Sequence, residues 1–585
     1  MARHIEQLNT EVLVVGGGVG GTAAALQAAR RGVKTLLVSE GAWLGGMLTS
    51  AGVAAPDGNE LAAWQTGIWG QFLRELQQHP DGLDHGWVSL FTFDPRLGAK
   101  TLAAWVHQLP NLTWIAHQSP VAVLTQGRRV LGVRFPDYEI RATLTLDGTE
   151  LGDLLALGDL PHRWGWEWQG EFNEPSAPVG PNAMTEHYPV QSPTWVFLLR
   201  ETVGNAATPI AAPTMVGNHR FQSPWERHSQ AAFLSYGQLP DRHYMVNWPI
   251  NGNDYGQDLN RLVGRQGEKQ AFLQEAYEYS YAFAHFLQTQ HFPHLELATD
   301  IFPQPGGLSP AFALHPYYRE SRRLRGQVTL TEKAILPQGQ VAPLPLHNHQ
   351  VTSIAIGNYA NDHHYPGYDF PLAPKSLQWG GRWTGTPFTI PFGAVLPQTV
   401  QGLLPCEKNI SVSHIANGST RLQPLVMNTG QAVGMIAALS IEQNCDPQDL
   451  AVREVQEALI GDRWAPAAVI PLFNLTPDHP DWADWQRHYL DHPDAYPESG
   501  HCPVDATRAC LPLAATPLVY RGQLHKPNEH SYQFSCEPSV PPLDLITVRP
   551  EVEQQLQQLR AGTQITVGGR YNPSGNWLIA EAIAL

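Results

Sequence analysis

Histidines that could move a proton gather at three places in the chain. They are His347 with His349, His363 with His364 beside Asp362, and His414. A neutral imidazole can take a proton from a hydroxyl or amino group, and a neighbouring aspartate can orient its ring. We predict His363 and His414 as catalytic residues, with ordinary hydrogen-bonded histidines as the alternative. No recognisable ligand set accompanies them, so we predict no metal site.

Arginines are concentrated in one short segment, His315 to Gly326, which reads HPYYRESRRLRG. A guanidinium can hold a carboxylate through two hydrogen bonds and does not lose its proton. We therefore predict Arg319 and Arg322 at a catalytic site, as an anion grip or a fixed positive field. An interior ion-pair network led by Glu320 is the alternative.

One carboxylate, Asp57, stands in the sequence Pro-Asp-Gly. This tripeptide is typical of a turn, so we expect a solvent-exposed carboxylate rather than one that points at a substrate.

The composition describes a large, acidic, globular protein. The chain has 585 residues, which favours two to four domains because a single core stops growing well below that length. Against 37 Lys and Arg there are 53 Asp and Glu, which leaves a formal charge of −16. Nucleic-acid binding needs an excess of basic residues, so we expect no nucleic-acid partner.

The cysteines form no Cys-x-x-Cys pair, so their spacing predicts neither a zinc ribbon nor an iron–sulfur site. They are Cys406, Cys445, Cys502, Cys510 and Cys536. A reduced, cytoplasmic setting is expected. No run of about eighteen apolar residues occurs, so we expect neither a membrane span nor a signal peptide.

Residues 11–40 predict a strand, a tight turn, a helix and a second strand. Gly16, Gly18 and Gly21 occupy the positions of a GxGxxG motif, in which glycine allows the turn, the approach of a pyrophosphate and close helix packing. The helix N-terminus then faces the anion. Glu40 ends the second strand, where an acid hydrogen-bonds a ribose hydroxyl and would repel the 2′-phosphate of NADP.

The glycine motif does not distinguish NAD from FAD, but the loop after it does. Gly45 and Gly46 stand in a Trp-Leu-Gly-Gly sequence directly beyond Glu40. Here the chain resembles the FAD-dependent oxidoreductase family of the glutathione-reductase-like superfamily, in which this loop runs along the flavin side of the cofactor. Further similar segments are residues 145–159, 315–326, 356–369, 388–398 and 408–439.

The resemblance implies FAD as the cofactor. The cofactor contacts that it implies are Gly16, Gly18, Val19, Gly20, Gly21, Glu40, Gly45, Gly46, Met47, Val121, Ser419, Arg421 and Pro424. Residues 408–439 are similar to the closing segment of the family, a turn-rich loop that leads into a Gly- and Ala-rich helix starting near Val426. The dipole at that helix N-terminus could stabilise negative charge on a reduced flavin.

The fold class is therefore α/β, with a discontinuous Rossmann-like FAD-binding domain of residues 1–160 and 390–450. It encloses an α+β substrate domain of residues 161–389, in which apolar residues at spacings of three and four predict a helix from Glu268 to Thr289. Residues 451–510 are rich in Pro and Asp, and we expect an extended surface connection. Residues 511–585 predict a small β-rich module, similar to an OB barrel, with one helical stretch from Glu551 to Arg560.

These features predict an FAD-dependent oxidoreductase that oxidises a small organic substrate of the amine, amino acid or alcohol type. Hydride would pass to flavin N5, and oxygen or another acceptor would reoxidise the flavin. A monooxygenase, a double-bond reductase or desaturase, and a non-catalytic binding protein stabilised by FAD stay open as alternatives. We expect no membrane partner, and the oligomeric state is left open.

Overall fold

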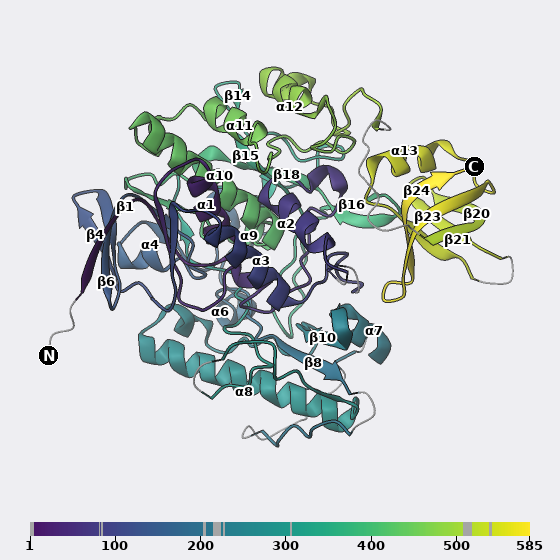
Figure 1. The fold of residues 1–585 in the computed structure, drawn as a ribbon, viewed down its shortest axis with the longest axis horizontal. Coiled ribbons are helices and arrows are strands. Elements are labelled where there is room, and N and C mark those ends of the chain that lie inside the picture. Colours follow the sequence, from purple (N-terminus) through teal and green to yellow (C-terminus); the bar gives the residue numbers. More distant parts are fainter. Residues whose placement is uncertain are drawn as a thin grey trace.

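A Rossmann-like sheet lies on the left of the computed structural model in Figure 1. The structure describes residues 5–80, 82–83, 86–202, 206–213, 221, 224–225, 228–304, 307–506, 518–537 and 541–585. The strand order is β3-β2-β1-β6-β5-β4, and β19 pairs with the end of β6. The strands are β1 Glu6–Val15, β2 Thr35–Val38, β3 Leu112–Ile115, β4 Ala122–Gln126, β5 Arg129–Arg134, β6 Tyr138–Asp147 and β19 Leu403–Pro405.

The carboxyl ends of four parallel strands meet at one edge of this sheet. Val15 of β1 is in register with Val38 of β2 and with Asp147 of β6, and Pro405 of β19 is also in register with Asp147. The loops that follow these strands must therefore lie side by side. In open α/β sheets this edge is where ligands bind.

Two helices pack closely beside the sheet, α1 (Val19–Arg30) and α10 (Gln423–Gln443). Glycines and alanines on both helices let their backbones approach. By length and composition α10 could cross a membrane, but 94% of its apolar window is buried inside the protein, as expected of a core helix. The helices α2 (Gly67–Gln77) and α3 (Pro95–His107) follow β2 in the sequence.

A second, antiparallel sheet of order β11-β8-β10-β9 lies in the region of the expected substrate domain. Beside it runs α8 (Gln266–Gln290), close to the bounds that the apolar spacing predicts. Phe272, Phe283 and Phe286 of this helix are buried, so the aromatic stripe belongs to the core. The strands are β8 Phe197–Glu201, β9 Gln238–Leu239, β10 His243–Val246 and β11 Leu295–Leu297.

Short elements connect the two sheets. The strand pairs are β7 His162–Arg163 with β12 Arg323–Leu324, β13 Leu346–His347 with β14 Gln350–Val351, β15 Ser353–Asn358 with β18 Pro387–Pro391, and β16 Ser376–Trp379 with β17 Arg382–Gly385. The short helices are α4 Asp153–Leu157, α5 Gln169–Phe172, α6 Ala183–His187, α7 Gln230–Tyr236 and α9 His414–Thr420.

Residues 451–506 are not the extended surface connection that their composition suggested. They contain α11 (Val452–Ile460) and α12 (Trp482–Asp491), and Phe473 and Leu475 have no exposed surface. Between these two helices the apolar side chains lie in irregular structure, which has no helical or strand period. They are nevertheless part of the main core, and this segment packs onto the body of the protein.

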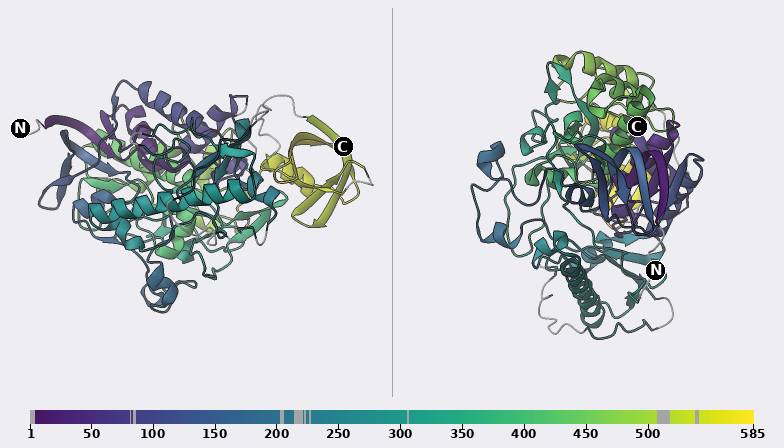
Figure 2. Two further views of the ribbon diagram at one scale, coloured as in Figure 1. Left: turned by 90° about the horizontal axis from the view of Figure 1, so that it is seen from below. Right: turned by 90° about the vertical axis from the view of Figure 1, so that its left-hand side faces the viewer.

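The C-terminal module is a closed barrel of order β20-β21-β22-β24-β23 at one end of the molecule (Figure 2). Its elements are β20 Leu518–Asn528, β21 Ser531–Ser535, β22 Leu543–Ile546, α13 Pro550–Gln558, β23 Gln564–Asn572 and β24 Trp577–Ala584. The expected beginning of the module, at 511, lies outside the described residues. The barrel contacts the body through Thr547 N, which donates to Gly380 O at 2.8 Å, and Asn572 Nδ2, which donates to Gly86 O at 3.1 Å.

Candidate active site

The loop after β1 forms a cradle built from backbone. Gly16 has a φ of +106°, and a Cβ on Gly16 would lie 2.2 Å from the backbone of Gly148. A Cβ on Gly20 would lie 1.7 Å from Cys406 O, and one on Gly430 of α10 would lie 2.2 Å from Gly20 O. Only glycine allows these approaches, which leave the amide groups at the start of α1 as the anion-binding surface.

The second glycine loop closes on the first. Gly45 and Gly46 both have positive φ, Gly45 N donates to Gly17 O at 2.9 Å, and a Cβ on Gly46 would lie 2.7 Å from the Cα of Gly18. Met47 is fully buried, and Val19 and Gly21 are buried within α1. The backbone of these two loops therefore fits the pyrophosphate of a dinucleotide.

The charged side chains at this cradle were not predicted from the sequence. Gly20 N donates to Oε2 of the buried Glu407 at 2.7 Å, and Lys408 Nζ lies between Glu407 and Glu150. Asp147 is buried at the end of β6. Glu407 and Lys408 follow β19 at the carboxyl edge of the sheet, the one general signal that could have identified them.

The other expected cofactor contacts spread over three segments. Glu40 is exposed directly after β2, and Val121, 51% exposed, precedes β4. The turn-rich stretch before the closing helix is itself a helix, α9, capped by Ser413 and containing Ser419. The closing helix begins at Gln423 rather than near Val426, with Pro424 in its first turn, where proline is tolerated.

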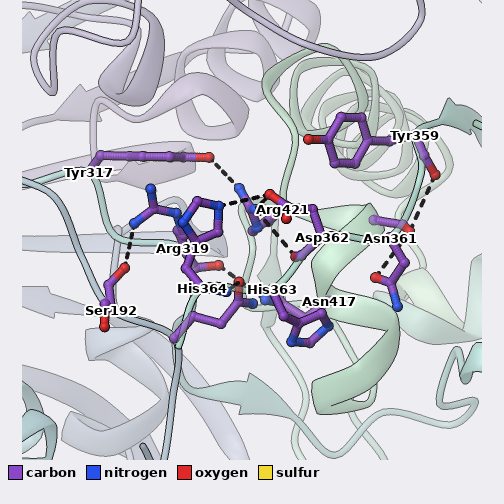
Figure 3. Close-up of polar contacts among 12 residues, drawn as sticks. Ser192, Tyr317, Arg319, Tyr359, Asn361, Asp362, His363, His364, Asn417 and Arg421 are labelled. Atoms are coloured by element: carbon purple, nitrogen blue, oxygen red, sulfur yellow. Dashed lines mark hydrogen bonds and ion pairs between the residues drawn. The ribbon is translucent and has the colours of Figure 1, made fainter. Parts of the chain in front are cut away.

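A cavity lies where the substrate region meets the start of α10, and several of its lining residues are drawn in Figure 3. Its charged lining residues are Asp57, Arg319, Asp362, His364 and Arg421, and its tyrosines are Tyr236, Tyr317 and Tyr359. Val53, Leu422 and Gln423 tie the cavity to the glycine loop and to α10. The cavity wall thus joins the expected cofactor region to a polar substrate site.

The two arginines of the cavity are each held by an aspartate. Arg421 lies 3.0 Å from Asp362 Oδ2 and donates to Tyr317 Oη at 2.6 Å. Arg319 lies 3.2 Å from Asp254 Oδ1. Both guanidinium groups are almost completely buried, so they are fixed in position without solvent.

His364 connects these two ion pairs. Its Nδ1 lies 2.8 Å from Asp254 Oδ2 and its Nε2 lies 2.8 Å from Asp362 Oδ2. Burial raises the pKa of each aspartate, but for Asp254 the charges of Arg319 and His364, and for Asp362 those of His364, Arg421 and Arg319, outweigh burial and hold the pKa below its usual value. Both carboxylates therefore remain charged.

The segment 361–365 is neither helix nor strand, and its side chains face two environments (Figure 3). Asp362 and His364 line the cavity, whereas His363 Nδ1 and Tyr365 Oη lie 2.7 Å apart on the other side. Tyr365 Oη in turn lies 2.5 Å from His414 Nε2, and His414 Nδ1 lies 2.9 Å from Glu320 Oε1. The expected catalytic residues His363 and His414 therefore belong to a series of contacting side chains that does not line the cavity.

The hydrogen-bond partners of His363 determine which of its ring nitrogens carries the proton. His363 Nε2 faces the carbonyl of Ile415 at 3.0 Å and must donate to it, so Nδ1 accepts from Tyr365. Burial, and then the charge of His414, lowers the pKa of His363 to about 3, which keeps it neutral. Through these contacts His363 and His414 hold the segment that carries Asp362 and His364 in position.

The arginine segment divides in two. Arg319 lines the cavity, whereas Arg322 donates to Leu151 O at 2.9 Å and pairs with Asp153 at 3.0 Å, away from it. Arg323 contacts both carboxylate oxygens of Glu167 at 3.0 Å. Interior ion pairs thus account for Arg322 and Arg323, whereas an anion grip stays a prediction for Arg319.

Asp57 is not the solvent-exposed turn carboxylate that its tripeptide suggested. It is half-buried and lines the cavity. Burial, together with the charges of Glu60 and Asp362, raises its pKa well above the usual value, against the opposite effect of Arg421 and Arg382. A turn signature describes only local backbone, and the neighbouring segments cover this turn.

Comparison with known proteins identifies the family of the chain. The profile of the family described as FAD dependent oxidoreductase matches residues 11–459. The sarcosine oxidase subunit alpha of Corynebacterium sp. (strain P-1) is 47% identical over 57 residues, which are 10% of this chain and 6% of that protein.

Two solved structures resemble the chain more distantly. A geranylgeranyl bacteriochlorophyll reductase-like protein of Thermoplasma acidophilum has a TM-score of 0.34 at 11% identity, over 78% of this chain and 84% of the other. The L-proline dehydrogenase of P. horikoshii has a TM-score of 0.24 at 10% identity, over 34% of this chain and 62% of the other.

Proposed function

Because the chain belongs to the FAD-dependent oxidoreductase family, we propose that it oxidises a small amino acid at the carbon that bears the amino group. The observation that carries this proposal is the presence of fixed arginines and carboxylates in one cavity, which is lined by Arg319, Arg421, Asp57 and Asp362. An amino acid offers one anionic and one cationic group, and this lining matches both.

FAD is the cofactor of this oxidoreductase, and when bound it supplies the acceptor for the two electrons of the substrate. The chain would hold it through the glycines of the two loops after β1 and β2 and through the start of α10. Among the described residues, Gln423 Oε1 and Asn428 Oδ1 of α10 have no hydrogen-bond partner although both are buried, as suits atoms that await a polar ligand.

The carboxylate of the substrate would bind at Arg421 and Arg319. A buried guanidinium that is already fixed by Tyr317 and Asp362 loses little freedom when a second carboxylate shares it. The charge of each arginine is neutralised by its own aspartate. A substrate without net charge therefore does not change the net charge of the cavity.

The amino group would lie toward Asp57 and Asp362. A substrate ammonium must lose a proton before hydride can leave its carbon, and the product is then an imine that water hydrolyses. Asp57 suits the role of proton acceptor because a carboxylate with a raised pKa is a stronger base than an ordinary aspartate.

The test is anaerobic mixing of the FAD-loaded protein with matched compounds, followed by flavin absorbance. The panel contains amino acids, the corresponding amines without the carboxylate, and the corresponding 2-hydroxy acids. Bleaching by an amino acid and not by its amine is the expected result. Bleaching by the hydroxy acids alone would assign alcohol oxidation instead, and a flavin that no compound reduces would refute the proposal.

A further inference from the structure

Glu407 occupies the place where the glycine motif leads us to expect the cofactor anion. Its Oε2 accepts the hydrogen bond of Gly20 N at 2.7 Å, at the start of α1. A Cβ on Gly18 would lie 2.7 Å from the same oxygen. The side chain has no exposed surface. A carboxylate of the protein therefore already uses an amide that would otherwise face a pyrophosphate.

The charges around Glu407 do not balance when all are ionised. Lys408 Nζ lies 3.3 Å from Glu407 Oε1 and also pairs with Glu150. Asp147 at the end of the neighbouring strand β6 and the thiol of Cys406, which directly precedes Glu407, are also close. Glu150 Oε1 and Asp147 Oδ2 have no hydrogen-bond partner within the described ranges. Two carboxylates thus share one ammonium while a third lies nearby, and two more negative charges from a pyrophosphate could not be buried there without compensation.

We propose that Glu407 sets the affinity of the protein for FAD by releasing the amide of Gly20 and taking up a proton when FAD binds. The neutral carboxyl group no longer repels the pyrophosphate. Lys408 then compensates the negative charge of the pyrophosphate. The glycine backbone thus fits the cofactor, and this one side chain makes binding depend on pH.

The direction of the dependence follows from the surroundings of Glu407. Burial raises its pKa, Lys408 opposes the rise and Glu150 adds to it, and the result is a pKa of about 7. A nearby pyrophosphate raises the pKa further, so between the two values binding consumes a proton. The Kd for FAD should then increase up to about tenfold for each pH unit above neutrality and be constant in more acid solution.

The experiment titrates the FAD-free full-length protein with FAD from about pH 6 to about pH 9, following the quenching of flavin fluorescence. Calorimetry in two buffers of different ionisation enthalpy counts the protons taken up. Wild type should bind more weakly as pH rises and take up close to one proton. Glu407→Gln should bind with the low-pH affinity of the wild type throughout and take up none.

Two further variants keep the test decisive. Glu553→Gln is the matched control, because Glu553 is a buried barrel carboxylate whose pKa is also raised to about 7, and this variant should keep the wild-type dependence. Glu150→Gln removes a neighbouring negative charge, so the Kd should begin to rise at a lower pH. The same slope in wild type and Glu407→Gln, or weaker binding by Glu407→Gln at every pH, would overturn the proposal. No substrate is present, so these outcomes are independent of the amino-acid test above.

Discussion

The guanidinium of Arg421 lies 3.0 Å from Oδ2 of Asp362, and 42% of the Asp362 side chain is exposed to the cavity against 3% of Arg421. The buried guanidinium of Arg421 is thus held by the protein, whereas the carboxylate of Asp362 is accessible from the cavity. A substrate carboxylate would meet a positive group of set position, and a substrate ammonium would meet the aspartate beside it. The two residues are distant in sequence and are brought together by folding, which places Asp362 N 3.5 Å from Gly418 O of α9.

Arg421→Lys should leave FAD bound but lower kcat/KM for the best amino acid of the panel about 30- to 1000-fold. A lysine has one ammonium in place of a fork, so it cannot contact Tyr317, Asp362 and a substrate carboxylate together. Steady-state kinetics and the flavin-to-protein ratio measure the two effects separately. Arg261→Lys, at a pair with Glu275 that does not line the cavity, is the control and should keep wild-type kinetics. Unchanged kinetics for Arg421→Lys would remove this residue from the substrate site.

Asp57→Asn should abolish the rise of kcat/KM with pH. The pKa of Asp57 lies well above its usual value, so the wild-type enzyme should gain activity as pH rises through that raised pKa and Asp57 ionises. Asparagine has no such transition. The measurement is a pH–rate profile, with the exposed Asp369→Asn as control. A rise that persists in Asp57→Asn belongs to another group and would contradict the role of Asp57 as base.

The sequence was sufficient for features that depend on neighbours in the chain. The first strand, glycine turn, helix and second strand form one local unit, and the dense arginines led directly to Arg319. The sequence was not sufficient where distant segments meet. Asp254, Tyr317 and His364 come together from three parts of the chain, and no local pattern relates them. The prediction for residues 451–506 was wrong because the core segment between α11 and α12 is irregular and has no period. The prediction for Asp57 was wrong because burial by other segments does not alter its turn signature.

His363→Gln should make the protein less sensitive to acid. The pKa of His363 is about 3 in the folded protein, because of burial and then the charge of His414, against about 6.5 for an unfolded chain. The unfolded state therefore binds more protons between these values, and stability falls as pH falls through this range. Between neutral pH and about pH 5 the wild type should lose about 2 kcal/mol that the variant retains.

Thermal unfolding at both pH values measures the difference as a smaller decrease of Tm for His363→Gln. The absolute stability of the variant at neutral pH also reflects the lost contacts to Tyr365 and Ile415, so the comparison is between decreases. His349→Gln, at an exposed turn, should show the wild-type decrease. Equal decreases in all three proteins would mean that His363 is not the group that charges in acid.

Gly430→Ala should destabilise the protein and weaken FAD binding together. The new methyl group would lie 2.2 Å from Gly20 O, so α10 and α1 must move apart, and overpacking of this kind costs about 1–3 kcal/mol. The same shift displaces the amides at the start of α1, which should raise the Kd for FAD. Gly267→Ala is the matched control, because Gly267 is also helical and has no atom within 4 Å of the added Cβ. It should be neutral or slightly stabilising, as alanine is the better helix former. Thermal unfolding and FAD titration of both variants give the comparison, and a Gly430→Ala protein as stable as Gly267→Ala would show that α1 and α10 are not in backbone contact.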